Sequence, residues 1–243
     1  MKKNRFKLVL IILSSLLIIS FGITLCWGTY KIGPLEVINT FLGNGTKLQN
    51  TAVLSIRLPR LLVGAFVGIA LSTAGGVLQT ITKNDLADTG IIGINAGAAV
   101  AAVLFITFST GNYYSELGQL SIFILPLMAI LGAGISSFVI YIMSSKGGIR
   151  PKRLLLIGIG LNAVLNAFIT FFTFRGGVGD YNRVLVWTSG SLWGAGAAYA
   201  KVIIPIVTLL YVLVLLNNKK LDILNLSKLS PNDNASSSER FKI

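Results

Sequence analysis

Long apolar blocks separated by polar segments constrain this 243-residue chain more than any other feature. Six blocks cover residues 7–27, 61–81, 91–109, 121–143, 154–174 and 202–217, of which the last is the shortest. An α-helix needs about 20 apolar residues to cross the ~30 Å hydrocarbon core of a bilayer. The pattern predicts an all-α, polytopic membrane helix bundle with about six transmembrane helices and no room for a sizeable soluble domain.

The residue types present exclude several kinds of chemistry. Charged residues make up 12% of the chain, whereas about a quarter is typical of a soluble domain. There is no histidine, and Cys26 is the single cysteine. Disulfides, Cys/His zinc sites and Ser-His-Asp triads within the chain are therefore excluded. The Gly-rich run at 175–180 lacks the Gly-Lys-Ser/Thr of a phosphate loop, and we predict a flexible outer loop there. We expect neither an enzyme nor a resident cofactor.

The excess of basic residues predicts the orientation of the chain. Lys and Arg number 21 against 8 Asp and Glu, giving a net charge of +13. In a soluble protein this would suggest nucleic acid, but here the basic residues lie mostly between apolar blocks, where they orient helices. With the N-terminus inside, 14 basic residues fall in inner segments and 7 in outer ones. We therefore predict a multi-pass cell-membrane protein with both termini inside, no nucleic acid partner, and 28–60, 110–120 and 175–201 outside.

Uncharged polar residues within the apolar blocks are candidates for a pathway. They are Ser72, Thr73, Gln79, Asn95, Asn162, Asn166, Thr170 and Thr173. An unpaired amide in hydrocarbon costs several kcal/mol, so these side chains are expected to face the bundle or water. Asn162 and Asn166 are four apart and share one helix face, which Thr170 and Thr173 continue. Two interpretations remain open for this face, a conduit lining and hydrogen bonding between helices.

Small and aromatic residues suggest how the helices pack and where they end. Glycines recur at four-residue spacing in the pairs Gly64 and Gly68, Gly93 and Gly97, and Gly190 and Gly194. Such spacing allows close contact between helices in lipid. Trp27, Trp187 and Trp193 lie near predicted outer helix ends, as in an interfacial aromatic belt.

The most specific signal begins at Arg57-Leu-Pro-Arg60. It continues through a small-residue helix that ends near Gln79, and then through Asn84-Asp-Leu-Ala-Asp-Thr-Gly90 into a Gly/Ala-rich segment. This order resembles the permease subunits of the iron-siderophore, haem and cobalamin ABC importers, the FecCD family. The family pattern has prolines where this chain has Asp85 and Thr89. The cytoplasmic loop motif otherwise matches at Asn84, Leu86, Ala87 and Asp88.

Further segments extend the resemblance over residues 1 to about 227. They are 153–162, 187–192 and 221–226. The resemblance implies a transmembrane permease domain at 1–227, corresponding to the first six helices of a ten-helix permease fold. The polar composition of 228–243 predicts a disordered tail. Because four more helices follow in the family, we expect a truncated, split or frameshifted member.

The resemblance also implies a mechanism and partners. An extracytoplasmic siderophore-binding protein would dock at Arg57 and Arg60 and deliver a ferric siderophore, and cytoplasmic ATPase subunits would drive alternating access. A second permease subunit would complete the pathway, lined by the second helix around Ser72 to Gln79 and by the face from Asn162 to Thr173. Membrane lipid is the remaining partner, and snorkelling to lipid phosphates is the alternative role of the two arginines. The alternative function is an inactive remnant or a non-transporting scaffold.

Overall fold

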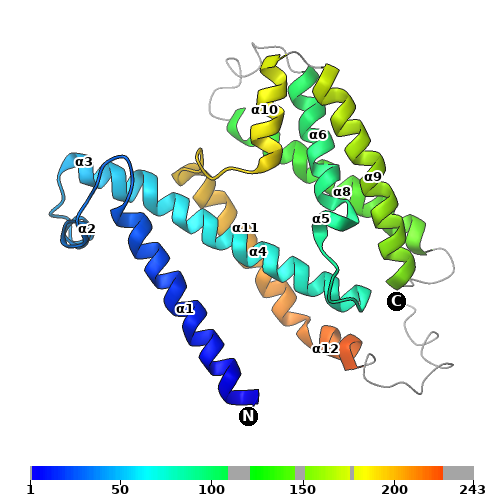
Figure 1. Cartoon of the computed structure of the whole chain (residues 1–243), viewed down its shortest axis with the longest axis horizontal. Helices are drawn as coiled ribbons and strands as arrows, with labels where there is room; N and C mark the ends of the chain where they lie inside the picture. The colour runs from blue at the N-terminus through cyan, green and yellow to red at the C-terminus, as the bar shows by residue number, and fades with distance from the viewer. Residues whose placement is uncertain (1, 109–120, 146–150, 176–177, 227–243) are drawn as a thin grey trace. The chain divides into compact units, whose positions relative to one another are not determined.

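A computed structural model describes residues 2–108, 121–145, 151–175 and 178–226 (Figure 1). Every regular element in these ranges is a helix, which confirms the predicted all-α class. The tail predicted at 228–243 lies outside the described residues. The chain forms two compact units, Met1–Ala70 with Leu192–Leu213, and Leu71–Ser191 with Val214–Ile243. We call them the first and the second unit.

Five helical segments are long and apolar enough to cross a membrane. They are Arg5–Cys26, Lys47–Thr82, Phe123–Ser145, Pro151–Arg175 and Ala197–Leu216, which correspond to five of the six predicted blocks. Four of them belong to α1 (Lys2–Cys26), α8 (Ser121–Ser145), α9 (Pro151–Arg175) and α11 (Ala197–Leu216). The remaining segment joins α3 (Lys47–Asn50), a π-helical stretch η1 (Thr51–Arg57) and α4 (Leu58–Thr82) without interruption.

The third predicted block is not one continuous helix. It is divided into α5 (Thr89–Ile92) and α6 (Ile94–Phe108) by Gly93, whose φ is +88°. Glycine adopts this left-handed conformation without the steric cost of a Cβ. A Cβ at Gly93 would also lie 3.1 Å from the Asn162 backbone. The main helix of this block begins at Ile94, after the bend, so our prediction of one helix over 91–109 is wrong at its start.

Two of the three segments predicted to lie outside the membrane contain helices, and the third, 110–120, is not among the described residues. Residues 28–60 include α2 (Pro34–Phe41), α3 and η1, and 175–201 include α10 (Val178–Ser189). The flexible loop predicted at 175–180 is therefore wrong from Val178 onward. On α10, Val184 is buried against Val103 and Ile106, with Trp187 packed beside them. Packing of these apolar residues at helical spacing stabilises α10. The predicted aromatic belt stays a prediction.

Close contact between glycines joins α6 to α8 in the second unit. A Cβ at Gly97 would lie 2.7 Å from the Gly132 carbonyl oxygen, and one at Gly132 would lie 2.6 Å from Ala101 Cβ. The buried Ser136 Oγ donates to the Gly93 carbonyl oxygen at 2.9 Å. Gly97 thus has the predicted packing role. Around α6 pack α8, α9 and α10 (Figure 1), and the short α12 (Asn218–Leu226) follows α11.

Two alanine substitutions on α8 separate packing from helix propensity. Gly132→Ala forces α6 and α8 apart, and we expect a loss of about 1–3 kcal/mol of stability, typical of overpacking. Gly134→Ala is the matched control, because no atom lies within 4 Å of its added Cβ. The measurement is the thermal unfolding midpoint in detergent. Equal midpoints for the two variants would contradict the contact.

Candidate functional site

Arg57, the last residue of η1, caps the C-terminal end of α1. Its Nη1 donates to the Leu25 carbonyl oxygen at 2.5 Å, and its Nη2 donates to the Tyr30 carbonyl oxygen. Leu25 lies in the last turn of α1, where carbonyls lack partners within the helix. A cation is also favoured at the negative end of the helix dipole. Arg57 therefore stabilises the end of a membrane-spanning helix and the turn that follows it.

Gly28 makes this arrangement possible. A Cβ at Gly28 would lie 2.8 Å from Arg57 Nη2 and 3.2 Å from Cζ. The turn containing Gly28 is closed by a hydrogen bond from the Ile32 backbone N–H to the Cys26 carbonyl oxygen at 3.1 Å. The chain after α1 thus bends around the guanidinium group, and the absence of a side chain at residue 28 allows the close contact.

Arg60 makes a similar contact one turn further along, in α4. Its Nη2 donates to the carbonyl oxygen of Trp193, which precedes α11, at 2.6 Å. Its Nε is buried and has no hydrogen-bond partner among the described residues. The two arginines predicted to dock a binding protein are both half-buried and both bind backbone carbonyls of the first unit. Docking is not tested by these contacts and stays a prediction.

The loop after α4 begins with a Schellman motif. The Lys83 N–H donates to the Thr80 carbonyl oxygen at 3.4 Å, and the Asn84 N–H donates to that of Gln79 at 3.2 Å. Lys83 has a φ of +53°, the left-handed conformation that this motif requires. Gln79 Nε2 donates to the Asp85 carbonyl oxygen at 3.0 Å. Gln79, predicted to line a pathway, therefore binds the backbone of the loop.

Each residue of the predicted loop motif has a separate place in this loop. Asn84 Oδ1 accepts from the Leu86 N–H at 3.0 Å, and Asp88 Oδ2 caps α5 by accepting from the Gly90 N–H at 3.0 Å. Ala87 is buried, whereas the Leu86 side chain is 83% exposed. Thr89 is the first residue of α5, a position where proline is favoured, which explains the proline of the family pattern.

The polar face predicted on α9 is present, and its hydrogen bonds stay within the helix. Asn166 Nδ2 donates to the carbonyl oxygen and to Oδ1 of Asn162, at 2.8 and 2.9 Å. Thr170 Oγ1 donates to the Asn166 carbonyl oxygen at 2.9 Å, and Thr173 Oγ1 to that of Ile169 at 2.6 Å. Asn166 and Thr170 are exposed. These bonds leave the polar face available to water or to a neighbour.

The other predicted pathway residues lie on different helices. Ser72 is exposed and Thr73 is half-buried on α4, and Asn95 is exposed near the start of α6. A pathway role for them stays a prediction. No group of three or more His, Cys, Asp or Glu side chains in the described part of the chain could hold a metal ion.

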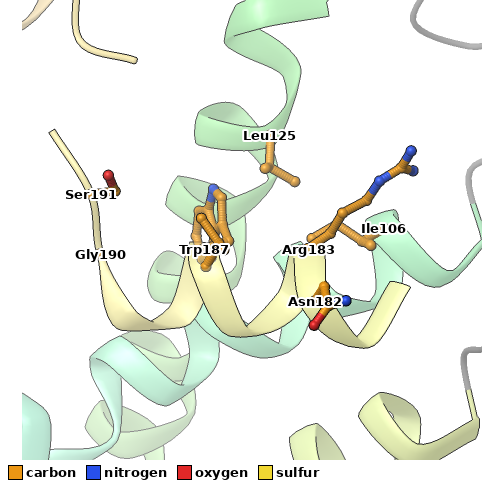
Figure 2. Close-up of a pocket in the computed structure, with 8 residues that line it drawn as sticks. Ile106, Leu125, Asn182, Arg183, Trp187, Gly190 and Ser191 are labelled. Carbon is orange, nitrogen blue, oxygen red and sulfur yellow. The ribbon is translucent and has the colours of Figure 1, made fainter. Parts of the chain in front are cut away.

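A cavity of about 650 Å³ in the second unit was not predicted from the sequence (Figure 2). It lies where α10 and the residues after it meet α6 and α8, and its lining is mainly apolar. The lining residues are Ile106, Leu125, Asn182, Arg183, Val186, Trp187, Gly190 and Ser191. Figure 2 shows Arg183 and Trp187 on successive turns of α10, with the guanidinium group extending away from the indole. In the sequence, the apolar residues Val184 and Trp187 are three apart, and this helical spacing was the signal from which α10, which borders the cavity, could have been predicted.

The contact between Gly28 and Arg57 predicts coupled substitutions. Gly28→Ala displaces the guanidinium group, so it and Arg57→Gln should each lower stability by about 1.5–3 kcal/mol, the value of hydrogen bonds to a charged group. The double variant should lose less than the sum of the two single losses, because both remove the same bonds. Thermal unfolding in detergent measures this.

Gly22→Ala on α1 is the control for that cycle, because no atom lies within 4 Å of its added Cβ. Its stability should equal or exceed that of the parent, since alanine is favoured over glycine in a helix. If the stability losses of Gly28→Ala and Arg57→Gln simply added in the double variant, this would contradict the capping of α1 by Arg57.

Known proteins resemble this chain over most of its length. The sequence model of the FecCD transport family matches residues 16–233. The iron(3+)-hydroxamate import system permease protein FhuG of Bacillus subtilis is 38% identical over 225 residues, covering 93% of this chain and 67% of that protein. The ferric enterobactin transport system permease protein FepD of Escherichia coli is 36% identical over 179 residues, covering 73% of this chain and 51% of that protein.

The fold is shared with a solved structure. That structure is an inward-facing conformation assigned to the metal-chelate type of ABC transporter, with a TM-score of 0.72 and 24% identity. It matches 90% of this chain and 64% of the solved chain. This chain thus spans about half to two thirds of the length of the relatives it matches. It is a multi-pass protein of the cell membrane, and its sequence belongs to the FecCD transport family.

Proposed function

We propose that this chain is a membrane-spanning permease subunit of an ABC importer. It carries a ferric siderophore, or a related iron chelate, into the cell with energy from a separate ATPase. The observation that carries the proposal is the match to an iron-hydroxamate permease along 93% of this chain. The helical fold with five membrane-length segments is consistent with that role.

The polar face of α9 supports a pathway of weak, uncharged contacts. Asn166 and Thr170 are exposed on a helix of membrane-spanning length, yet both have hydrogen-bond partners within the helix. A pathway lined by such groups offers water and a polar chelate hydrogen-bonding contacts without binding either tightly. Passage requires contacts weak enough for the ligand to leave. Ser72, Thr73 and Asn95 are the further candidates for this lining.

Residues at the start of α4 and after it in the chain are candidates for contacts with different partners. The 25 residues of α4 extend about 37 Å, enough to cross the hydrocarbon core. Arg57 immediately precedes this helix, and Arg60 lies in its first turn. Their positive charge attracts an acidic binding protein. Their hydrogen bonds to carbonyl oxygens hold the two guanidinium groups in position. The exposed Leu86, in the loop that follows α4, is the candidate contact for the ATPase subunits. A second permease subunit, identical or different, completes the pathway.

Uptake of radiolabelled iron tests the proposed transport. Deletion of the gene should abolish accumulation of one class among hydroxamate, catecholate, citrate and haem complexes, and re-expression of this chain should restore it. Strains lacking the corresponding ATPase serve as the control for energy coupling. Unchanged uptake across the whole panel would contradict transport and favour a non-transporting scaffold or remnant.

Cysteine labelling tests the pathway lining separately. In a Cys26→Ser background, Asn166→Cys and Thr170→Cys should react with a water-soluble thiol reagent. Phe168→Cys is the matched control, because Phe168 is 50% exposed on the opposite side of the same helix and is expected to face lipid. Reaction rates are measured in membrane vesicles from both sides. Equal rates at the three positions would contradict a water-filled pathway along this face.

A further inference from the structure

We propose that α2 is an interfacial helix whose outer face, formed by Leu35, Ile38 and Leu42, inserts into the lipid headgroup region beside the end of α1. We call this surface the outer face of α2. The proposal concerns the lipid surface alone and does not depend on the proposed transport activity. An amphipathic helix of this kind lies in the plane of the membrane rather than across it.

The outer face is apolar and uncovered. Leu35 and Ile38 of α2 and Leu42, its C-cap residue, are separated by three and four residues, so they lie on one side of the helix. Their side chains are 77%, 55% and 70% exposed. Val37 and Thr40, on another side, are buried. Contact with the rest of the first unit is therefore made through Val37 and Thr40, and the outer face points away from it.

The packing of α2 places this face at the level of the membrane surface. Val37 belongs to a buried cluster with Ile32 and Val53, against which Leu25 and Cys26 of the last turn of α1 also pack. The span of α1, Arg5–Cys26, has 22 residues and extends about 33 Å, close to the hydrocarbon thickness. Cys26 thus lies near the boundary of the hydrocarbon, and α2 packs beside it.

The exposure of α1 favours lipid as the occupant of the outer face of α2. None of the apolar window of α1 is buried by the rest of the chain as described. In Figure 1, α2 is seen end-on next to the C-terminal end of α1, whose axis runs across the view, so the two helix axes cross. A helix that crosses a membrane span at the hydrocarbon boundary lies along the bilayer surface. Continuity with the lipid-exposed α1 is the reason for choosing lipid as the occupant.

Side chains around α2 are of the types found at membrane interfaces. Trp27 is 71% exposed and Tyr30 49% exposed in the turn after α1, and Lys31 Nζ lies 6.0 Å from the Trp27 ring centroid. Aromatic rings and basic groups are favoured at the headgroup level. Glu36, the acidic residue of α2, accepts from the Gly33 N–H at 2.8 Å and so caps the helix start.

Spin labels on the full chain, reconstituted in vesicles of phosphatidylcholine and phosphatidylglycerol, test the proposal. In a Cys26→Ser background, labels are placed by Leu35→Cys, Ile38→Cys and Leu42→Cys, with Glu36→Cys on another side of α2 as the control. Collision rates with oxygen, which partitions into lipid, and with a water-soluble nickel chelate are measured. The ratio of oxygen to nickel collisions should be higher at the three outer positions, at a depth of about 5–10 Å.

Two results would overturn the proposal. Labels on the outer face that collide with nickel as often as the control would show that the face is in water. Labels shielded from both reagents would show that protein covers the face, either a second copy of the chain or a docked partner. Because all three substituted side chains are exposed, the labels should leave the fold intact. A label at Leu42 in an Ile38→Asn background should shift toward nickel contact, which checks that the face inserts as a unit.

Discussion

Backbone groups at helix ends and breaks have no water to bind in the hydrocarbon region, and this constraint governs the described parts of the molecule. At several helix ends and breaks among the described residues, a particular side chain completes the hydrogen bonding. Arg57 binds the last turn of α1, Asp88 caps α5, and Ser136 binds the carbonyl of Gly93 at the break before α6. Each contact allows the chain to change direction near the membrane without leaving polar groups unpaired.

The same constraint changes how the family motifs are interpreted. Arg57 was predicted from the resemblance to contact a partner, and Asn84 and Asp88 to belong to the cytoplasmic loop motif. In the structure all three bind the chain's own backbone. Their residue types are explained locally: a guanidinium group reaches two carbonyls, and a short amide or carboxylate accepts from the N–H two residues on. Leu86 has no comparable role for its side chain, which remains exposed. Sequence motifs of a permease therefore combine residues that build the turn with a residue left available for contact.

Much of the helical content was predictable, because hydrophobicity over about 20 residues is a requirement of the bilayer and is visible in sequence. The two errors have a common cause. The break at Gly93 depends on the approach of Asn162, and α10 depends on packing of Val184 against Val103 and Ile106, residues distant in sequence. Gly93 was predicted as a helix contact, and in the structure it is both a close contact with α9 and the residue where the chain bends. The carbonyl partners of Arg57 and Arg60, Leu25 and Trp193, are 32 and 133 residues away, so local sequence patterns could not predict them either.

The polar side chains of α9 have a mechanical consequence. Asn166, Thr170 and Thr173 each donate a hydrogen bond to a carbonyl oxygen one turn earlier in their own helix. An element that slides along this helix breaks none of these bonds, so its motion meets little energetic resistance from them. A helix whose polar side chains are hydrogen-bonded within the helix suits a protein that changes conformation repeatedly, because its conformations then differ little in free energy.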